Sequence, residues 1–168
     1  MPLKIRVHER LNEAFNPKTV KIGDHVWMAE NLAIDDGGEG IKYNPATGTL
    51  YYTYDAVCRI IRMLNDSWRI PSNEDWDKAC EECGGVLFKQ AHLYSDCSLA
   101  DEINAKTANG YYDTSHEHFE NVGKSNCYWT SSMHGSPSFR DYRYMHNNSV
   151  YQSSFHIITG LPVRLIKD

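Results

Sequence analysis

Helical periodicity is confined to residues 53–83 of this chain, and this limits the folds open to it. Between residues 53 and 65 apolar side chains recur at the spacing of an amphipathic helix. A second helix is predicted to begin at Ser72, because Ser72 and Asp75 have the spacing of an N-terminal capping box. Beyond residue 86 the chain consists of short apolar or aromatic runs separated by turn residues. Two helices followed by many short strands predict an α+β domain.

The predicted strands are short and lie on both sides of the helical region. Residues 19–32 are expected to form a hairpin, since Gly23-Asp24 separates two β-prone runs and glycine tolerates the positive φ of a tight turn. Residues 86–88, 127–130 and 161–166 read as further strands. A chain of 168 residues needs only one hydrophobic core.

Charge and composition narrow the classes of partner. The 17 Lys and Arg residues are outnumbered by 22 Asp and Glu, without a basic run, so nucleic acid is not an expected partner. No stretch has the length of a membrane span, and residues 1–6 lack the apolar core of a signal peptide, so we expect a soluble chain with no membrane span. The five cysteines match no dense disulfide framework and are expected to be free thiols.

Several motifs occur in a fixed order along the chain. The matching stretches are Val20 to Leu32, Leu50 to Ala56, Ser67 to Trp76, Gly110 to Asp113, Tyr128 to Ser132 and Gly160 to Leu165. In these stretches the chain resembles the Fibrobacter succinogenes major paralogous domain, a branch of the C-type lectin-like fold. The resemblance covers residues 19–168 and leaves residues 1–18 as an N-terminal extension.

This resemblance carries expectations about architecture and function. It implies two helices flanking short antiparallel sheets, with the N- and C-terminal strands adjacent. Related branches of the fold contain the variable proteins of diversity-generating retroelements, in which adenine-directed mutagenesis rewrites codons near the C-terminus. Their implied role is binding to a receptor, a protein or glycan, and their implied location is a cell surface or virion.

The C-terminal segment supports a binding function independently of the resemblance. If Asn147-Asn148 forms a two-residue turn, Met145 pairs with Val150 and Tyr144 pairs with Tyr151. Alternation along the two strands then places aromatic residues and small hydrogen-bonding residues together on one face, a composition typical of paratopes. The predicted ligand-binding residues are Arg140, Tyr142, Tyr144, His146, Asn147, Ser149, Tyr151, Ser153, Phe155 and Trp129.

The same alternation leaves a second interpretation open. In that interpretation the aromatic residues cover the core and the opposite face is solvated. Met145 and Val150 are apolar enough to anchor the opposite face in the core, which favours the binding interpretation.

Residue usage near the C-terminus suggests how the surface arose. Residues 125–166 contain no Lys and no Glu. Randomising the adenines of an AAC or AAT codon reaches Asn, Ser, Tyr, Phe, His, Asp and Arg, but never Lys, Glu, Gln, Met or Trp. Most residues from His134 to His156 belong to the reachable set. Met145 and Gln152 within this range, and Met133 just before it, do not. Retroelement diversification is therefore one hypothesis, and a family preference for Tyr, Ser and Asn is the alternative.

The sequence offers little support for catalysis, a metal or a cofactor. The Glu-Pro-Asn loop and Trp-Asn-Asp strand with which C-type lectins hold calcium are absent, since Trp129 is followed by Thr130-Ser131. The copper-binding C-terminal cysteine pair of the formylglycine-generating enzymes is absent too. His116 and His118 could bind zinc together with Glu117 and Glu120, but no Cys or third His lies nearby in the sequence, and two histidines on a polar loop are usually just exposed. We expect a binding protein rather than an enzyme. A structural domain of a cell-surface or virion assembly is the first alternative, a metal-dependent enzyme is the second, and the oligomeric state is undecided.

Overall fold

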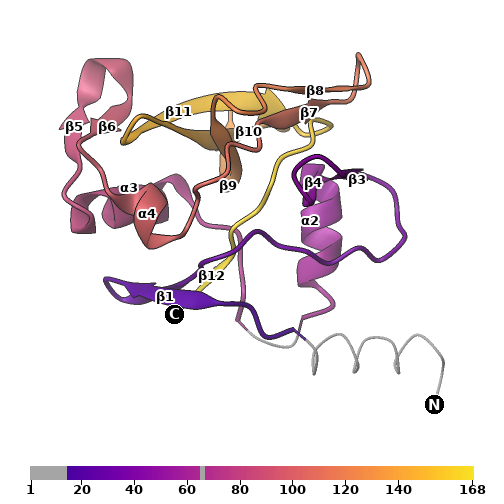
Figure 1. Ribbon diagram of the computed structural model, residues 1–168, viewed down its shortest axis with the longest axis horizontal. Coiled ribbons are helices and arrows are strands. Elements are labelled where there is room, and N and C mark those ends of the chain that lie inside the picture. The colour runs from indigo at the N-terminus through magenta and orange to yellow at the C-terminus, as the bar shows by residue number, and fades with distance from the viewer. Residues whose placement is uncertain (1–14, 65–66) are drawn as a thin grey trace.

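The computed structural model describes residues 15–64 and 67–168. Residues 1–14 of the predicted N-terminal extension and Asn65, at the end of the first predicted helix, lie outside the described residues. The fold is α+β, with few helices and several small antiparallel sheets (Figure 1). The predicted fold class is confirmed at this level.

In the described part of the chain, four strands precede the two longer helices, and the other strands follow them with two shorter helices in between. The strands before the helices are β1 (Thr19–Ile22), β2 (His25–Met28), β3 (Ile41–Asn44) and β4 (Thr49–Tyr52). The helices are α2 (Tyr54–Ile61), α3 (Asn73–Glu82), the 3-10 helix η1 (Lys89–Ala91) and α4 (Leu99–Glu102). The later strands are β5 (Val86–Phe88), β6 (Leu93–Ser95), β7 (Tyr111–Asp113), β8 (His118–Glu120), β9 (Asn126–His134), β10 (Ser136–His146), β11 (Ser149–His156) and β12 (Ile166–Lys167).

Two sheets form the upper and lower layers of the fold in Figure 1. The larger sheet has five strands in the order β5-β6-β11-β10-β9, and the smaller one has the order β1-β2-β12. Strand β12 pairs antiparallel with β2, so the predicted adjacency of the N- and C-terminal strands is confirmed. The β1–β2 hairpin is also confirmed, with Ile22 opposite His25 across the Gly23-Asp24 turn.

Both predicted helices form, and their N-terminal caps explain where they begin. In α2 the side chain of Thr53 accepts a hydrogen bond from the Ala56 N–H. Ser72 and Asp75 form the predicted capping box at the start of α3, with each side chain accepting from the backbone N–H of the other residue. Helix α3 ends before Gly84, which adopts a φ of +79°.

Helix α3 joins the two sheets through aromatic packing. Trp76 of α3 is fully buried, 4.8 Å from Trp27 of β2 and 5.9 Å from Tyr128 of β9 between ring centroids. Trp27 and Tyr128 are also fully buried. Helix α3 therefore fixes the position of the five-stranded sheet relative to the three-stranded sheet β1-β2-β12.

The apolar segment 161–166 is buried as expected but is not a continuous strand. Of these residues only Ile166 belongs to a strand, β12, while Leu161 forms an isolated bridge to Tyr52. The Val163 carbonyl accepts a hydrogen bond from the Leu32 N–H at 2.9 Å. The segment runs between the two sheets (Figure 1) and bonds to a different partner at each step, which prevents a regular ladder.

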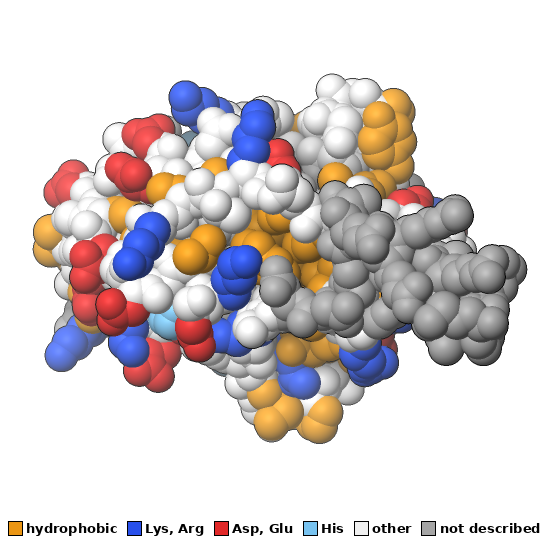
Figure 2. All heavy atoms as spheres, turned by 90° about the horizontal axis from the view of Figure 1, so that it is seen from below, with side chains coloured by type: hydrophobic (Ala, Val, Ile, Leu, Met, Phe, Trp, Pro, Cys, Tyr) orange, Lys and Arg blue, Asp and Glu red, His pale blue; other side chains and the backbone are white. Residues whose placement is uncertain are grey.

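Seen from below, the molecule carries basic and acidic side chains interspersed, with hydrophobic side chains gathered near the centre of the face (Figure 2).

All five cysteines are free in the structure, as predicted. None of the helices in the described part of the chain is long and apolar enough to cross a membrane.

Asp75 makes the stability of the fold sensitive to acid. Burial alone would raise its pKa, but hydrogen bonds from Arg69 (2.5 Å) and Ser72 outweigh burial and lower the pKa of Asp75 to about 2. A carboxylate with a depressed pKa stabilises the folded state above its unfolded pKa, and this contribution disappears as the pH falls through its folded pKa. We expect the wild-type protein to lose about 2 kcal/mol of unfolding free energy between pH 5 and pH 2 through this group.

Urea denaturation across this pH range measures the effect. Asp75→Asn should remove most of the acid dependence, while Asp24→Asn, in the exposed β1–β2 turn, should leave it intact. An unchanged acid dependence in Asp75→Asn would show that other carboxylates cause it.

Candidate functional site

The hairpin formed by β10 and β11 turns at the predicted position. Asn147 and Asn148 have φ angles of 48° and 59°, the left-handed conformation that a two-residue type I′ turn requires. Met145 faces Val150 and Tyr144 faces Tyr151, so the predicted register is confirmed. The Asn148 carbonyl also accepts a hydrogen bond from the Cys97 N–H at 2.9 Å, which ties the turn to the loop after β6.

A pair of substitutions at Asn148 tests this conformation. Alanine carries the Cβ penalty of the left-handed region and glycine does not. We expect Asn148→Ala to be less stable than Asn148→Gly by about 1–2 kcal/mol, measured by urea denaturation. Equal stabilities of the two variants would contradict the type I′ turn.

The face of the hairpin turned towards α3 is buried. Met145 and Val150 are 5% and 1% exposed and belong to the hydrophobic cluster around Trp76. Arg143 is only 1% exposed. The sequence-based expectation that Met145 and Val150 anchor this face is confirmed, and the alternative that this face is solvated is wrong.

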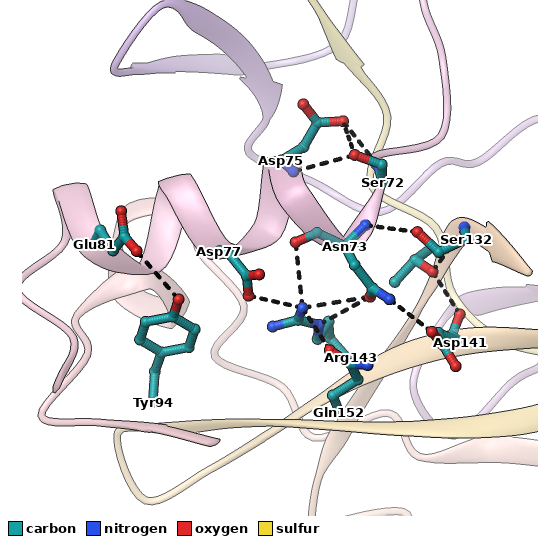
Figure 3. Close-up of polar contacts among 11 residues, drawn as sticks. Ser72, Asn73, Asp75, Asp77, Glu81, Tyr94, Ser132, Asp141, Arg143 and Gln152 are labelled. Carbon is teal, nitrogen blue, oxygen red and sulfur yellow. Dashed lines mark hydrogen bonds and ion pairs between the residues drawn. The ribbon is translucent and has the colours of Figure 1, made fainter. Parts of the chain in front are cut away.

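Polar contacts hold the buried face of the hairpin to the N-terminal end of α3 (Figure 3). Arg143 donates through Nη2 to Asp77 at 2.8 Å and to Gln152 at 2.9 Å. It also donates to the Asn73 carbonyl at 3.2 Å. The Asn73 side-chain amide in turn donates to Asp141 at 2.6 Å. These contacts come from three elements, so the hairpin has a fixed orientation on the helix.

The opposite, outer face carries a row of stacked aromatic rings. Tyr144 and Tyr151 lie parallel across the strands, with centroids 4.6 Å apart and an interplanar angle of 4°. Tyr142 stacks on Phe155 at 4.2 Å and 11°, and Tyr111 of β7 packs against Phe155 at 4.6 Å. Each ring packs against a neighbour, and this packing restricts the rotamers open to it.

A groove of about 620 Å³ runs along this outer face. It is lined by Asn121, Lys124, Ser125, Cys127, Tyr142, Tyr144, His146, Tyr151 and Ser153. Five of these residues were predicted from the sequence, namely Tyr142, Tyr144, His146, Tyr151 and Ser153. The groove therefore gathers half of the predicted set.

The other wall of the groove was not predicted. Asn121, Lys124 and Ser125 belong to the loop between β8 and β9. His146 Nδ1 contacts the Lys124 carbonyl at 2.9 Å, and this contact joins the loop to the hairpin. The polar residues of this loop predict a turn, but they do not predict which segment the turn contacts. His146 and Lys124 are 22 residues apart in the sequence.

The remaining predicted residues lie around the groove or beneath it. Arg140 lies over the ring of Tyr54 at 4.7 Å and does not line the groove. Asn147 and Ser149 line a neighbouring hollow of about 410 Å³ beside Cys97. Phe155 packs behind Tyr142, which is only 8% exposed. The interpretation in which the aromatic residues cover the core thus holds for Tyr142 and Phe155, which pack in or against one hydrophobic cluster.

Trp129 is not a surface residue, and its assignment to the ligand-binding set is wrong. It is fully buried, and its indole Nε1 donates to the Tyr52 carbonyl at 2.8 Å. Tyr142 faces it across the sheet, and both belong to one hydrophobic cluster. Strand β9 is buried from Asn126 to Thr130, because α3 contacts it and Trp129 packs against Tyr52 and Tyr54.

The groove residues are mostly neutral hydrogen-bonding groups. Burial raises the pKa of the Tyr142 and Tyr144 hydroxyls above the ordinary value, and it raises the pKa of the Cys127 thiol to about 12. All three groups keep their protons at neutral pH and are suited to hydrogen bonding rather than nucleophilic attack.

His116 and His118 pair with carboxylates of their own hairpin, β7–β8. His116 Nδ1 lies 2.9 Å from Asp113, and His118 contacts Glu120. Within residues 15–64 and 67–168, no group of three or more His, Cys, Asp or Glu side chains is placed to hold a metal ion.

Comparison of the chain with protein-family models, with curated protein sequences and with solved structures finds no match in any of the three.

Proposed function

We propose that this protein is a ligand-binding protein of the C-type lectin-like fold that contacts a protein or glycan through the groove on the outer face of the β10–β11 hairpin. The observation that carries the proposal is this groove of about 620 Å³, in which two half-buried stacked tyrosines, Tyr144 and Tyr151, stand beside Ser153 and His146. Tyrosine supplies a large contact area at a low entropic cost, and small polar residues supply adaptable hydrogen bonds.

The way the hairpin is held supports a preorganised binding surface. The buried contacts of Arg143 and Asn73 fix the hairpin on α3, and the ring stacking restrains the outer side chains. A surface that is already ordered loses little conformational freedom on binding, so more of the contact energy appears as affinity.

Binding is a better account of the groove than catalysis. The described residues that line the groove include no carboxylate. The tyrosines and the thiol with raised pKa values keep their protons at neutral pH. General acid–base catalysis needs a group whose pKa is tuned near the working pH, and nucleophilic catalysis needs an activated nucleophile.

The C-type lectin-like assignment rests on architecture together with the resemblance of residues 19–168. Two capped helices, α2 and α3, lie among short antiparallel sheets, and strand β12 returns to pair with β2 near the start of the chain. This arrangement is the one that the resemblance implies, and in it the outer face of the β10–β11 hairpin is partly exposed.

Diversification by a retroelement is favoured by the way residue types divide between the hairpin faces. Within residues 140–156 the residue types that adenine mutagenesis of an Asn codon does not reach are Met145 and Gln152. Met145 is buried, and Gln152 accepts a hydrogen bond from Arg143, so both belong to the face towards α3. A near-copy of the encoding DNA beside a reverse-transcriptase gene is the expected genomic finding, and the absence of both would refute this origin.

A binding screen tests the proposed function. The purified protein should bind at least one member of an array of glycans and surface proteins, in a saturable manner that soluble ligand competes. Binding to no member, together with a stable oligomer in light scattering, would support a structural role in a surface assembly instead. A bound metal found by elemental analysis, with turnover that depends on it, would indicate an enzyme.

A further inference from the structure

A second pocket lies on the opposite face of the five-stranded sheet from the groove. Its volume is about 220 Å³. It is lined by Asp77, Leu87, Lys89, His92, Tyr94, Arg143 and Gln152. Arg143 and Gln152 alternate along the hairpin with Tyr144 and Tyr151, so this pocket and the groove open on different sides of the sheet.

Arg143 brings an unused hydrogen-bond donor to this pocket. Its side chain is 1% exposed, and its Nη2 group donates to Asp77, Gln152 and Asn73. No described residue accepts a hydrogen bond from Nη1. Figure 3 shows one guanidinium nitrogen of Arg143 without a contact, on the side of Tyr94. A buried guanidinium with an unpaired N–H group favours an acceptor in the adjacent space.

The charges around the pocket favour an anion with a single charge. Asp77 is already paired with Arg143 at 2.8 Å. Among the Lys, Arg, Asp and Glu side chains that line the pocket, Lys89 therefore leaves one positive charge in excess. A doubly charged anion such as phosphate would place excess negative charge near Asp77, whereas a carboxylate matches the excess.

The walls and the volume of the pocket limit the rest of the ligand. Leu87 and Tyr94 provide apolar surface, and the Gln152 side chain is engaged by Arg143. The volume of about 220 Å³ lies below the roughly 300–1,000 Å³ of sites for drug-sized ligands, so the pocket suits a small molecule. We propose that this pocket binds a small carboxylate ligand, with its oxygens accepting from Arg143 Nη1 and its charge balanced by Lys89.

Acetate is a suitable probe, and nuclear magnetic resonance of the folded protein is the measurement. Titration with sodium acetate should shift the Arg143 Nε–H signal and the amides of Lys89 and His92 in a saturable manner, relative to sodium chloride at equal ionic strength. Lys89→Gln should weaken acetate binding at least about tenfold, because it removes a charge-assisted contact. Arg143 itself is left unchanged, since it holds the hairpin to α3.

Two controls separate this site from other effects. Lys78→Gln removes an exposed lysine of α3 that pairs with Glu74, and it should leave the acetate shifts unchanged. Tyr144→Ala/Tyr151→Ala should leave them unchanged as well, because those side chains lie on the other face. Shifts that do not saturate, or that saturate at the same acetate concentration in Lys89→Gln as in the wild-type protein, would overturn the proposal. Tighter binding of phosphate than of acetate would overturn the assignment of a carboxylate.

Discussion

Trp129→Ala is expected to lower the free energy of unfolding by about 3–5 kcal/mol. The fully buried indole packs edge-on against Tyr54 at 5.9 Å and donates to the Tyr52 carbonyl. Its removal leaves a cavity in the core and a buried carbonyl that loses its side-chain donor. Urea denaturation gives the unfolding free energies directly.

Tyr43→Ala is the matched control for this substitution. Tyr43 lies on β3 and is 58% exposed, so we expect its replacement to change stability by no more than about 0.5 kcal/mol. If Trp129→Ala unfolds at the same urea concentration as Tyr43→Ala, the result would contradict the burial of Trp129. Its assignment to the ligand-binding residues would then be open again.

Tyr144→Ala/Tyr151→Ala should weaken ligand binding by at least about 30-fold, the effect of losing a binding hot spot. The two rings are half-buried and stack on each other, and a cross-strand aromatic pair contributes only about 0.2–1 kcal/mol to folding relative to an Ala–Ala pair. The variant is therefore expected to remain folded. Isothermal titration with a ligand from the binding screen measures the loss of affinity.

Tyr142 is left intact in this experiment because the structure places it largely in the core. Tyr43→Ala again serves as the control, since it removes an exposed tyrosine of β3 that does not line the groove. Retention of full affinity by the double variant, or an equal loss in Tyr43→Ala, would exclude the stacked pair as the centre of the binding surface.

The features that could be predicted from the sequence are those set by local chemistry. The capping box of Ser72 and Asp75 fixes the start of α3 within a single turn. The Asn147-Asn148 turn fixes the register of the hairpin, and alternation then separates Tyr144 from Met145. Each of these inferences depends on residues only a few positions apart.

The features that could not be predicted depend on contacts between distant segments. Alternation assigns Tyr142 and Tyr144 to the same face, but packing against Phe155 and the core leaves Tyr142 far less exposed than Tyr144. Asn121 and Lys124 lie beside the hairpin only because the fold brings their loop there, and the local sequence does not predict this contact. The buried position of Trp129 follows from its contact with Tyr52, which is 77 residues away.

Mapping of the bound ligand on the protein tests the central claim most directly. Amide chemical-shift perturbations measured with a ligand from the binding screen should concentrate in residues 142–153 and in the facing loop, residues 121–125. Perturbations of this pattern would locate the ligand in the groove. Perturbations confined to other surfaces, such as the exposed strand β5 or helix α2, would contradict the claim that the outer face of the β10–β11 hairpin is the binding site.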